Sequence, residues 1–286
     1  MIPLQARKSL GQHFLIDSKA HERIVRAVAP VERDVVVEIG PGTGLLTKHL
    51  LATPLRHLIA FELDARVIPG LRSDFESFGD RFEVIEGDFL QADLSALAER
   101  FSSDLRVTGN IPYYITSPIL FKLIDARECV RDATLLLQRE VAERLVAKPS
   151  TKAYGIPTVL ANFFGSVKLL FHVPAGAFRP VPKVDSAVVQ LDFRLDYFAR
   201  SGTERPANFD AARFRTLVRT LFGMRRKTIR NNLKGLVSPV TLLELESSDE
   251  KRFLDLRAEA LDLCDFLALY RAVGAFSVRT PFDPTE

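Results

Sequence analysis

The strongest constraint on the fold is a regular alternation of strand-like and helix-like segments over the first half of the chain. VVVEI at 35–39 is a β-branched run that is typical of a strand buried on both faces. Four more strand-like runs follow: HLIAFELD, RFEVIEGD, LRVTGN and ATLLLQ. Helical segments are expected at 45–51, 65–78, 94–101, 117–126 and 140–147. Strands that alternate with helices predict right-handed crossovers and a mostly parallel, doubly wound α/β sheet.

The pattern changes after Leu160. VKLLFHV and SAVVQLDF read as two strands whose connection has no helical pattern, so we expect them to pair antiparallel at or near the edge of the sheet. The polar segment 196–209 contains Gly and Pro and indicates a domain boundary. We therefore expect a first domain at 1–198 and a small all-helical domain at 199–286, where apolar residues recur at helix spacing.

Composition excludes several classes of protein. The chain has 286 residues, a net charge of +3 and two cysteines that are far apart. The five histidines lack metal-ligand spacing, so we expect neither a disulfide framework nor a metal site. The N-terminus has no signal-peptide core, and the most apolar region is interrupted by Pro157, Asn162 and Lys168. We expect a soluble cytoplasmic protein with no membrane contact, and nothing suggests an obligate dimer, so we expect a monomer.

A glycine-rich loop follows the first of these strands. EIGPGTG places Gly40, Gly42 and Gly44 between a strand and a helix, where glycine lets a ligand approach the backbone closely. The spacing G-x-G-x-G differs from the dinucleotide fingerprint G-x-G-x-x-G, and there is no P-loop motif. A tight turn without a ligand is the simpler interpretation of this loop taken alone.

Two carboxylates end the next two strands. Glu62 can accept both hydroxyls of a ribose, and Asp88 can accept from an exocyclic amine such as that of adenine. Alone, each could be a solvated surface acid. Together with the glycine loop they predict a nucleoside site that needs no pyrophosphate, which suits S-adenosylmethionine better than NAD.

The fourth strand leads into Asn110, Ile111, Pro112 and Tyr113. The Asn110 amide oxygen can accept a hydrogen bond from an amino group, and Pro112 restrains the backbone so that the Ile111 carbonyl can face the same group. Tyr113 offers a flat surface for stacking on a flipped-out base. A turn with core-covering tyrosines is the alternative, but the position after the glycine loop and both acids favours a grip on adenine.

This arrangement predicts methyl transfer to adenine N6. The N6 lone pair is delocalised into the ring, so the nitrogen is a poor nucleophile. Hydrogen bonds to Asn110 and Ile111 would favour a pyramidal nitrogen and would stabilise the positive charge that develops on it. Reaction with a sulfonium methyl would then need mainly alignment.

Several long motifs resemble the KsgA family of ribosomal RNA adenine dimethyltransferases. They are KSLGQHFL, VEIGPGTGLLT, FELD, EGDF, GNIPYYITSPI, LLLQREVAERLVAKPSTKAYG, FRPVPKVDSAVV and RRKTIRNNL, spread over nearly the whole chain. The resemblance implies a Rossmann-like S-adenosylmethionine-dependent methyltransferase domain and a small helical C-terminal domain. It further implies N6,N6-dimethylation of two adjacent adenines near the 3′ end of 16S rRNA, late in the assembly of the small ribosomal subunit (30S).

The resemblance also assigns residues. Residues 1–20 would lie over the cofactor site, with His13 and Leu15 covering the cofactor. The residues that would line its site are Gly40, Gly42, Glu62, Asp88 and Asn110. Tyr113 and Phe178 would sandwich the target adenine. Tyr114 stands where some members of the family have Asn, and the resemblance gives it no role.

Charge is unevenly distributed over the C-terminal part. Residues 213–234 contain eight Lys or Arg and no acid, whereas residues 240–270 contain eight acids and three bases. The basic stretch, above all Arg225, Arg226, Lys227 and Arg230, is a predicted rRNA-binding surface to which Arg7 and Lys8 could add. The alternative is that these cations pair with the acidic stretch.

Three other functions compete with this interpretation. An Erm-type enzyme would perform the same chemistry on large-subunit rRNA, but FRPVPKVDSAVV and RRKTIRNNL favour the small-subunit enzyme. A non-catalytic ribosome-assembly factor could use the same fold, yet Asn110 and Tyr113 are both present. A nicotinamide-dependent oxidoreductase is disfavoured by the spacing of the glycines.

Overall fold

The computed structural model describes residues 12–274 and divides the chain into two compact units. The first unit runs to Val146 and includes Phe164–Asp196. The second consists of Ala147–Phe163 and the residues from Tyr197 onward. The predictions for Arg7, Lys8 and the rest of residues 1–11 lie outside the described part of the chain.

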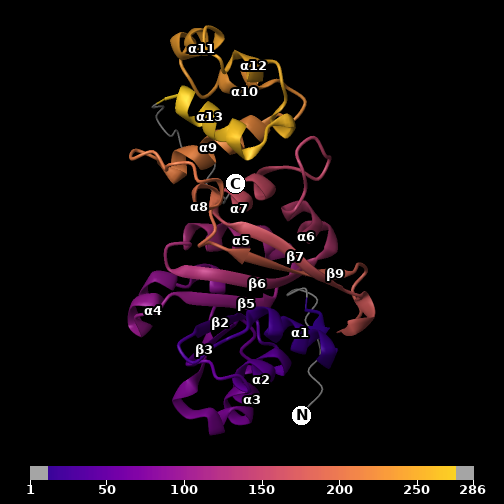
Figure 1. Cartoon of the computed structure of the whole chain (residues 1–286). Coiled ribbons are helices and arrows are strands. Elements are labelled where there is room, and N and C mark those ends of the chain that lie inside the picture. The colour runs from indigo at the N-terminus through magenta and orange to yellow at the C-terminus, as the bar shows by residue number, and fades with distance from the viewer. Residues whose placement is uncertain (1–11, 275–286) are drawn as a thin grey trace. The chain divides into compact units, whose positions relative to one another are not determined.

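A seven-stranded sheet forms the first unit, in the order β4-β3-β2-β5-β6-β9-β7 (Figure 1). Its strands are β2 (Val35–Ile39), β3 (His57–Glu62), β4 (Phe82–Glu86), β5 (Leu105–Asn110), β6 (Val130–Gln138), β7 (Ser166–Val173) and β9 (Ser186–Asp192). Neighbours from β4 to β6 are parallel, whereas β9 is antiparallel to both β6 and β7. The predicted doubly wound sheet with an antiparallel pair at its edge is confirmed.

Helices cover the sheet of the first unit. They are α1 (Ser18–Val28), α2 (Leu45–Leu51), α3 (Ile68–Asp74), α4 (Leu94–Phe101), α5 (Thr116–Asp125) and α6 (Arg139–Leu145). Residues of α1, α2 and α3 share one core cluster with Val36, Leu58 and Leu136 of the sheet. The helix expected at 65–78 is shorter than predicted, because the chain continues as a 3-10 turn (Glu76–Arg81) in which Gly79 has a φ of +51°.

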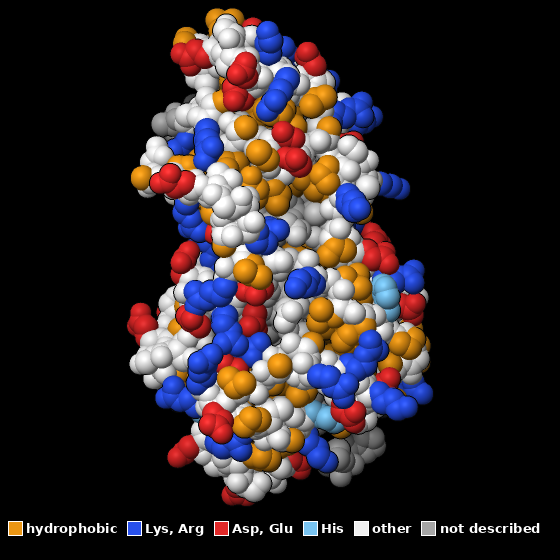
Figure 2. All heavy atoms as spheres, viewed as in Figure 1, with side chains coloured by type: hydrophobic (Ala, Val, Ile, Leu, Met, Phe, Trp, Pro, Cys, Tyr) orange, Lys and Arg blue, Asp and Glu red, His pale blue; other side chains and the backbone are white. Residues whose placement is uncertain are grey.

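The described part of the second unit is helical, as predicted. Its helices are α7 (Ile156–Phe164), α8 (Tyr197–Ser201), α9 (Ala211–Gly223), α10 (Ile229–Leu233), α11 (Pro239–Glu246), α12 (Lys251–Leu254) and α13 (Leu263–Ala272). On the face that Figure 2 shows, basic and acidic side chains are interspersed over these helices. Among the helices of residues 12–274, none is both long enough and apolar enough to cross a membrane.

The expected division at 198/199 needs one correction. Residues 147–163 belong to the second unit, not to the first. The reason is aromatic packing: the Phe163 ring stacks on Phe214 with centroids 3.8 Å apart and on Tyr197 at 5.2 Å. Sequence order concealed this assignment because the segment lies between two parts of the first unit.

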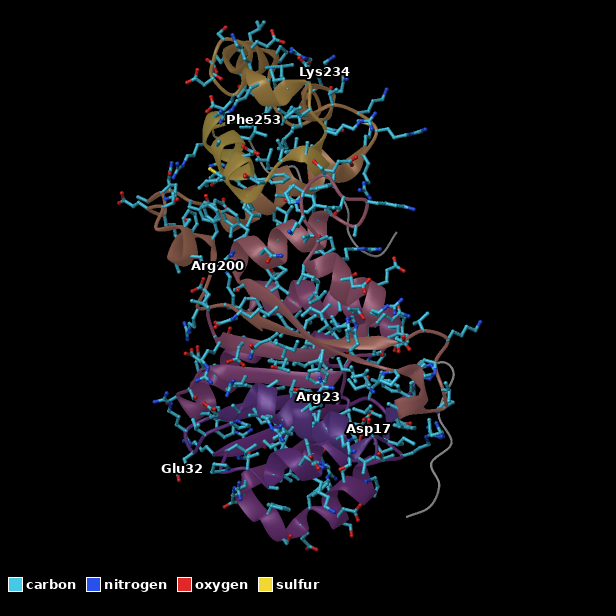
Figure 3. The ribbon with its side chains drawn as sticks, turned by 45° about the vertical axis from the view of Figure 1, so that its right-hand side comes forward. Asp17, Arg23, Glu32, Arg200, Lys234 and Phe253 are labelled. Atoms are coloured by element: carbon cyan, nitrogen blue, oxygen red, sulfur yellow. The ribbon has the colours of Figure 1, made fainter. Side chains whose placement is uncertain are left out.

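A small second sheet ties the N-terminal segment to the first unit. β1 (Phe14–Leu15) pairs antiparallel with β8 (Phe178–Arg179), and the Ile16 N–H donates to the Ala177 carbonyl at 2.8 Å. Asp17, labelled in Figure 3, then begins α1 by accepting hydrogen bonds from the first backbone N–H groups of that helix. This pairing, which the sequence pattern did not predict, holds residues 12–15 near the ends of the central strands.

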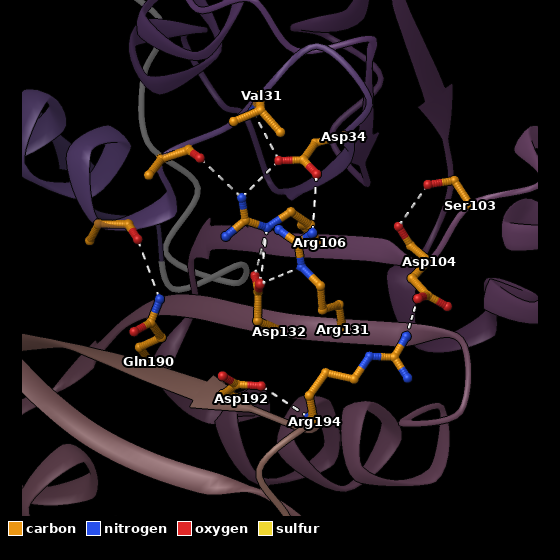
Figure 4. Close-up of polar contacts among 12 residues, drawn as sticks. Val31, Asp34, Ser103, Asp104, Arg106, Arg131, Asp132, Gln190, Asp192 and Arg194 are labelled. Atoms are coloured by element: carbon orange, nitrogen blue, oxygen red, sulfur yellow. Dashed lines mark hydrogen bonds and ion pairs between the residues drawn. The ribbon is translucent and has the colours of Figure 1, made fainter.

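A buried ion-pair network links the amino ends of three strands (Figure 4). Arg106 of β5 donates to Asp132 of β6 at 3.0 Å and to Asp34, which precedes β2, at 2.9 Å. Arg131 pairs with both carboxylates. Burial alone would raise the pKa of Asp34, but hydrogen bonds from the Val31 N–H and Arg106, with the charges of both arginines, hold it below its usual value.

Arg106→Ala should lower the free energy of unfolding by about 3–5 kcal/mol, because it leaves two buried carboxylates without their main partner. Arg100→Ala is the matched control: its guanidinium pairs with Glu83 at the surface, so its loss should cost much less than the loss of Arg106. Urea denaturation at neutral pH measures both. Equal effects of the two substitutions would contradict the structural role of the network.

The same network predicts acid sensitivity. Since the folded pKa of Asp34 is depressed, its contribution to stability is present above the unfolded pKa and is lost as the pH falls through the folded value. Thermal unfolding from about pH 5 down to about pH 2 should therefore show a steeper loss of stability for the wild type than for Asp34→Asn, which starts from a lower stability. Parallel profiles would exclude this contribution.

Candidate active site

A pocket lies at the carboxyl ends of the parallel strands. β2 pairs with β3 on one side and β5 on the other, so the following connections leave in opposite directions and open a crevice. β5 approaches β2 closely, since a Cβ at Gly109 would lie 2.6 Å from the Ile39 carbonyl oxygen. Nine predicted residues line the pocket: His13, Gly40, Gly42, Glu62, Asp88, Asn110, Ile111, Pro112 and Tyr113.

The glycine loop needs its glycines for two reasons. Gly40, Gly42 and Gly44 have φ values of +63°, +55° and +76°, a region that side chains disfavour. A Cβ at Gly42 would also lie 2.9 Å from Cε1 of Phe14. The loop therefore presents bare backbone to the pocket and packs against Phe14.

Glu62 is held rigidly by backbone donors. Its Oε2 accepts from the Gly42 N–H at 3.0 Å and its Oε1 from the Asp64 N–H at 2.8 Å. Burial raises the pKa of Glu62, and these N–H groups oppose that rise. A carboxylate has more acceptor sites than these backbone donors fill, so Glu62 can still accept from a ribose hydroxyl.

Asp88 keeps one oxygen available. Its Oδ1 accepts from the Leu90 N–H at 2.9 Å and begins a short 3-10 turn (Phe89–Gln91), while its Oδ2 has no hydrogen-bond partner in residues 12–274. An exocyclic amine in the pocket would satisfy that oxygen. Together with Glu62 and the bare loop, this donor and acceptor pattern fits the nucleoside part of S-adenosylmethionine.

One hydrogen bond orients the amide of Asn110. Its Nδ2 donates to the His13 carbonyl at 2.8 Å, so Oδ1 is the opposite branch of the amide. Neither Asn110 Oδ1 nor the Ile111 carbonyl accepts a hydrogen bond from any described residue, although the Ile111 side chain is buried. Both oxygens are therefore available to accept, so this pair of acceptors suits a ligand with N–H donors.

Tyr113 is fixed at both ends. Its hydroxyl lies 2.9 Å from Ser186 Oγ, and its ring stacks against His13 with centroids 5.9 Å apart and an interplanar angle of 25°. Burial of the hydroxyl raises the pKa of Tyr113 despite the hydrogen bond with Ser186. His13 in turn lies 2.7 Å from the Pro180 carbonyl through Nδ1, so one face of the tyrosine is covered by an anchored ring.

Two predicted site residues do not line this pocket. Leu15 is buried in the core cluster and borders only a smaller cavity behind the glycine loop. Phe178 has an exposed fraction of 0% and belongs to the same cluster. The cause is the β1–β8 pairing, in which Leu15 lies opposite Phe178. The ring that stacks on Tyr113 in this structure is His13, and the expected sandwich of the adenine between Tyr113 and Phe178 stays a prediction.

The pocket also contains apolar residues that the sequence argument missed. Phe14, Phe61, Leu63, Phe89 and Tyr114 line it beside the predicted polar groups. Leu63 and Phe89 each follow one of the predicted acids directly, and this adjacency was the available signal. Their side chains supply the apolar walls that a purine needs.

A second carboxyl group lies behind the loop. Glu38 is buried in β2 and accepts from Thr47 Oγ1 at 2.7 Å. Burial raises the pKa of Glu38 to about 8, with the Thr47 hydrogen bond opposing the rise and the charge of Glu62 adding to it. Glu38 is therefore protonated at neutral pH and borders the smaller cavity together with His21 and Asn110.

Glu38→Gln should change how stability depends on pH. The unfolded carboxyl loses its proton near its ordinary pKa of 4.5, whereas the folded one keeps it to about pH 8. Folding thus takes up a proton between these values, and the free energy of unfolding falls as the pH rises. Gln keeps an oxygen for Thr47 but binds no proton, so the variant should lose less stability between about pH 5.5 and 8. Melting temperatures over this range, with Glu32→Gln as an exposed control, measure the effect, and superimposable profiles of wild type and variant would refute it.

Comparison with known proteins agrees with this site. A family model described as Ribosomal RNA adenine dimethylase matches residues 4–262. The chain is 43% identical over 260 residues to a Ribosomal RNA small subunit methyltransferase A from Chromohalobacter salexigens, covering 90% of this chain and 89% of that protein. A protein of the same name from Hahella chejuensis is 42% identical over 266 residues, covering 93% and 92%.

Solved structures with a similar fold include a dimethyladenosine transferase and an rRNA methyltransferase. A dimethyladenosine transferase from Plasmodium falciparum matches with a TM-score of 0.75 and 29% identity, over 92% of this chain and 99% of that one. The 23S rRNA methyltransferase ErmE matches with a TM-score of 0.67 and 26% identity, over 92% and 100%. The sheet is thus that of a Rossmann-like methyltransferase, as predicted. With its motifs, pocket and family match, the chain belongs to the ribosomal RNA adenine dimethylase family.

Proposed function

We propose that this protein transfers methyl groups from S-adenosylmethionine to N6 of two adjacent adenines near the 3′ end of 16S rRNA, late in the assembly of the small ribosomal subunit. The single observation that carries the proposal is the pair of partnerless acceptors at Asn110 and Ile111 beside a nucleoside-shaped set of groups. Because the substrate is a bacterial ribosomal subunit, the proposed site of action is the cytoplasm.

The acceptors give the chain a way to activate an aromatic amine. Asn110 Oδ1 and the Ile111 carbonyl would accept the two hydrogens of adenine N6, which favours a localised lone pair on that nitrogen. Both oxygens would stabilise the positive charge that grows on N6 during alkylation. The alkylated nitrogen is acidic, so it can release its proton to water without a strong base. The free face of Tyr113, opposite His13, would hold the base.

The cofactor would be held by the other side of the pocket. Glu62 would accept from the ribose hydroxyls, Asp88 Oδ2 from the adenine amine, and the apolar walls would enclose the purine. S-adenosylmethionine supplies an electrophilic methyl group on a sulfonium. The glycine loop contributes by letting the ligand lie against bare backbone.

The small subunit is preferred over the large one on the grounds of similarity. Relatives that are 42–43% identical over about nine-tenths of this chain are named as small-subunit enzymes, whereas the structure of the 23S rRNA enzyme shares 26% identity. The fold is common to both kinds of enzyme. Mapping methylated adenines on the RNA of both subunits distinguishes them directly.

The four cations predicted to bind RNA fall into two groups, two with acidic partners among the described residues and two without. Arg225 donates to the Lys152 and Tyr154 carbonyls and pairs with Glu259, and Arg230 pairs with Glu246 and Asp255. These contacts correspond to the alternative in which the basic stretch pairs with the acidic one.

The remaining cations are available for phosphate. Arg226 and Lys227 are exposed and form no ion pair with any described residue, and the same holds for Lys234, labelled in Figure 3. We therefore propose that Arg226, Lys227 and Lys234 bind rRNA phosphates, while Arg225 and Arg230 hold the loop between α9 and α10 that carries Arg226 and Lys227.

Asn110→Ala should lower methyl transfer to unmethylated small subunits by about 100-fold or more, because one of two acceptors of the developing charge is lost. Incorporation of tritiated methyl groups measures transfer, and calorimetry with S-adenosylmethionine confirms that the pocket is still formed. Wild-type protein that binds subunits but never methylates them would favour the non-catalytic assembly factor. Full activity of Asn110→Ala would remove the proposed role of the amide.

A double substitution, Arg226→Ala with Lys227→Ala, should weaken subunit binding and lower the slope of log affinity against log salt by about two, roughly one for each phosphate contact. Arg230→Ala is the matched control, since its guanidinium already has acidic partners. Filter binding over a range of salt concentrations gives both slopes. A larger change in slope for Arg230→Ala than for the double variant would reverse the assignment.

A further inference from the structure

Two consecutive tyrosines in the 3-10 turn after β5 (Tyr113–Ile115) have opposite environments. Tyr113 is half-buried, hydrogen-bonded to Ser186 and stacked on His13. Tyr114 as a residue is 57% exposed, and among residues 12–274 its side chain has neither a hydrogen-bond partner nor a ring contact. Successive residues of a 3-10 helix are about 120° apart around the axis, so the two rings leave the turn in different directions.

Tyr114 nevertheless belongs to the pocket. It lines the same cavity as Asn110 and Tyr113, and its exposure places it at the mouth. A large exposed aromatic ring with no partner loses nothing by contacting a ligand and gains by burial of its faces. Tyr114 lies on a short turn between β5 and α5, so little conformational entropy is lost when a base stacks on its ring.

The described residues that line the cavity favour stacking of a base on an aromatic ring. Among residues 12–274, those that line the cavity include no Lys or Arg. The described lining therefore offers an entering strand an aromatic face. When one nucleotide is turned into the pocket, its neighbour loses a stacking partner, and an exposed ring beside the opening can replace that partner.

We propose that Tyr114 is the stacking platform for the nucleobase adjacent to the target adenine, that is, for the second adenine of the pair. This inference rests on the proposed function and adds a positioning residue to it. Tyr113 contacts the adenine that reacts, and Tyr114 stacks on the neighbouring base outside the pocket. This second stack determines which nucleotide of the strand enters the pocket.

Tyr114→Ala and Tyr114→Phe test the proposal on small subunits that carry unmethylated 16S rRNA. Loss of one base–aromatic stack should lower kcat/KM for subunits by about tenfold in the Ala variant, mainly through KM, whereas Phe should stay within about twofold because stacking needs no hydroxyl. Binding of S-adenosylmethionine should be unchanged. Val31→Ala removes exposed apolar surface at the amino end of β2 and is the control for non-specific effects.

Subunits in which the adenine next to the target is replaced by uracil provide the coupling test. The replacement should slow the wild type but have little further effect on Tyr114→Ala, since the two changes remove the same contact. Additive losses, unchanged activity of Tyr114→Ala, or a loss confined to cofactor binding would each overturn the inference. If the wild type itself methylates no subunit, the proposed function fails; if it does and Tyr114→Ala matches it, only the inference about Tyr114 fails.

Discussion

The close contact of β2 and β5 is the constraint on which the site depends. Ile39 and Gly109 lie opposite each other in parallel register, and only glycine leaves room for the Ile39 carbonyl. The next residues, Gly40 just after β2 and Asn110 at the end of β5, both line the pocket. The Gly40 backbone, proposed to contact the cofactor, and the Asn110 amide, proposed to contact the substrate, are thus both brought to the pocket by the pairing of β2 with β5.

Polar groups at the amino ends of the strands have hydrogen-bond partners in the protein, whereas some at the carboxyl ends have none among the described residues. At the amino ends, Arg106, Asp34 and Asp132 satisfy one another in a buried network. At the carboxyl ends, Asp88 Oδ2 and Asn110 Oδ1 have no partner among the described residues. These free oxygens are available to a ligand, whereas the polar groups at the amino ends are used for structure.

Local patterns were enough to predict most of the central sheet and the polar half of the pocket. β2, β5, α2 and α4 have the predicted bounds, because alternation and turn residues specify each of them within a few positions. The pairing of β1 with β8 joins residues more than 160 positions apart, and no local pattern indicates it. That pairing decides that Leu15 and Phe178 are buried. The acidic partners of Arg225 and Arg230 lie in the acidic stretch that the sequence offered as an alternative, but no local pattern indicates which cations pair.

The placement of residues 147–163 with the helices bears on how relatives of this protein could be recombined. The chain passes between its two units three times, after Val146, Phe163 and Asp196. Chimaeras made by a single junction near residue 198 would separate Phe163 from a matched Phe214 and pair it with a foreign ring. Exchange of the helical unit as a module requires three splice points, and the short internal segment has to travel with the C-terminal one.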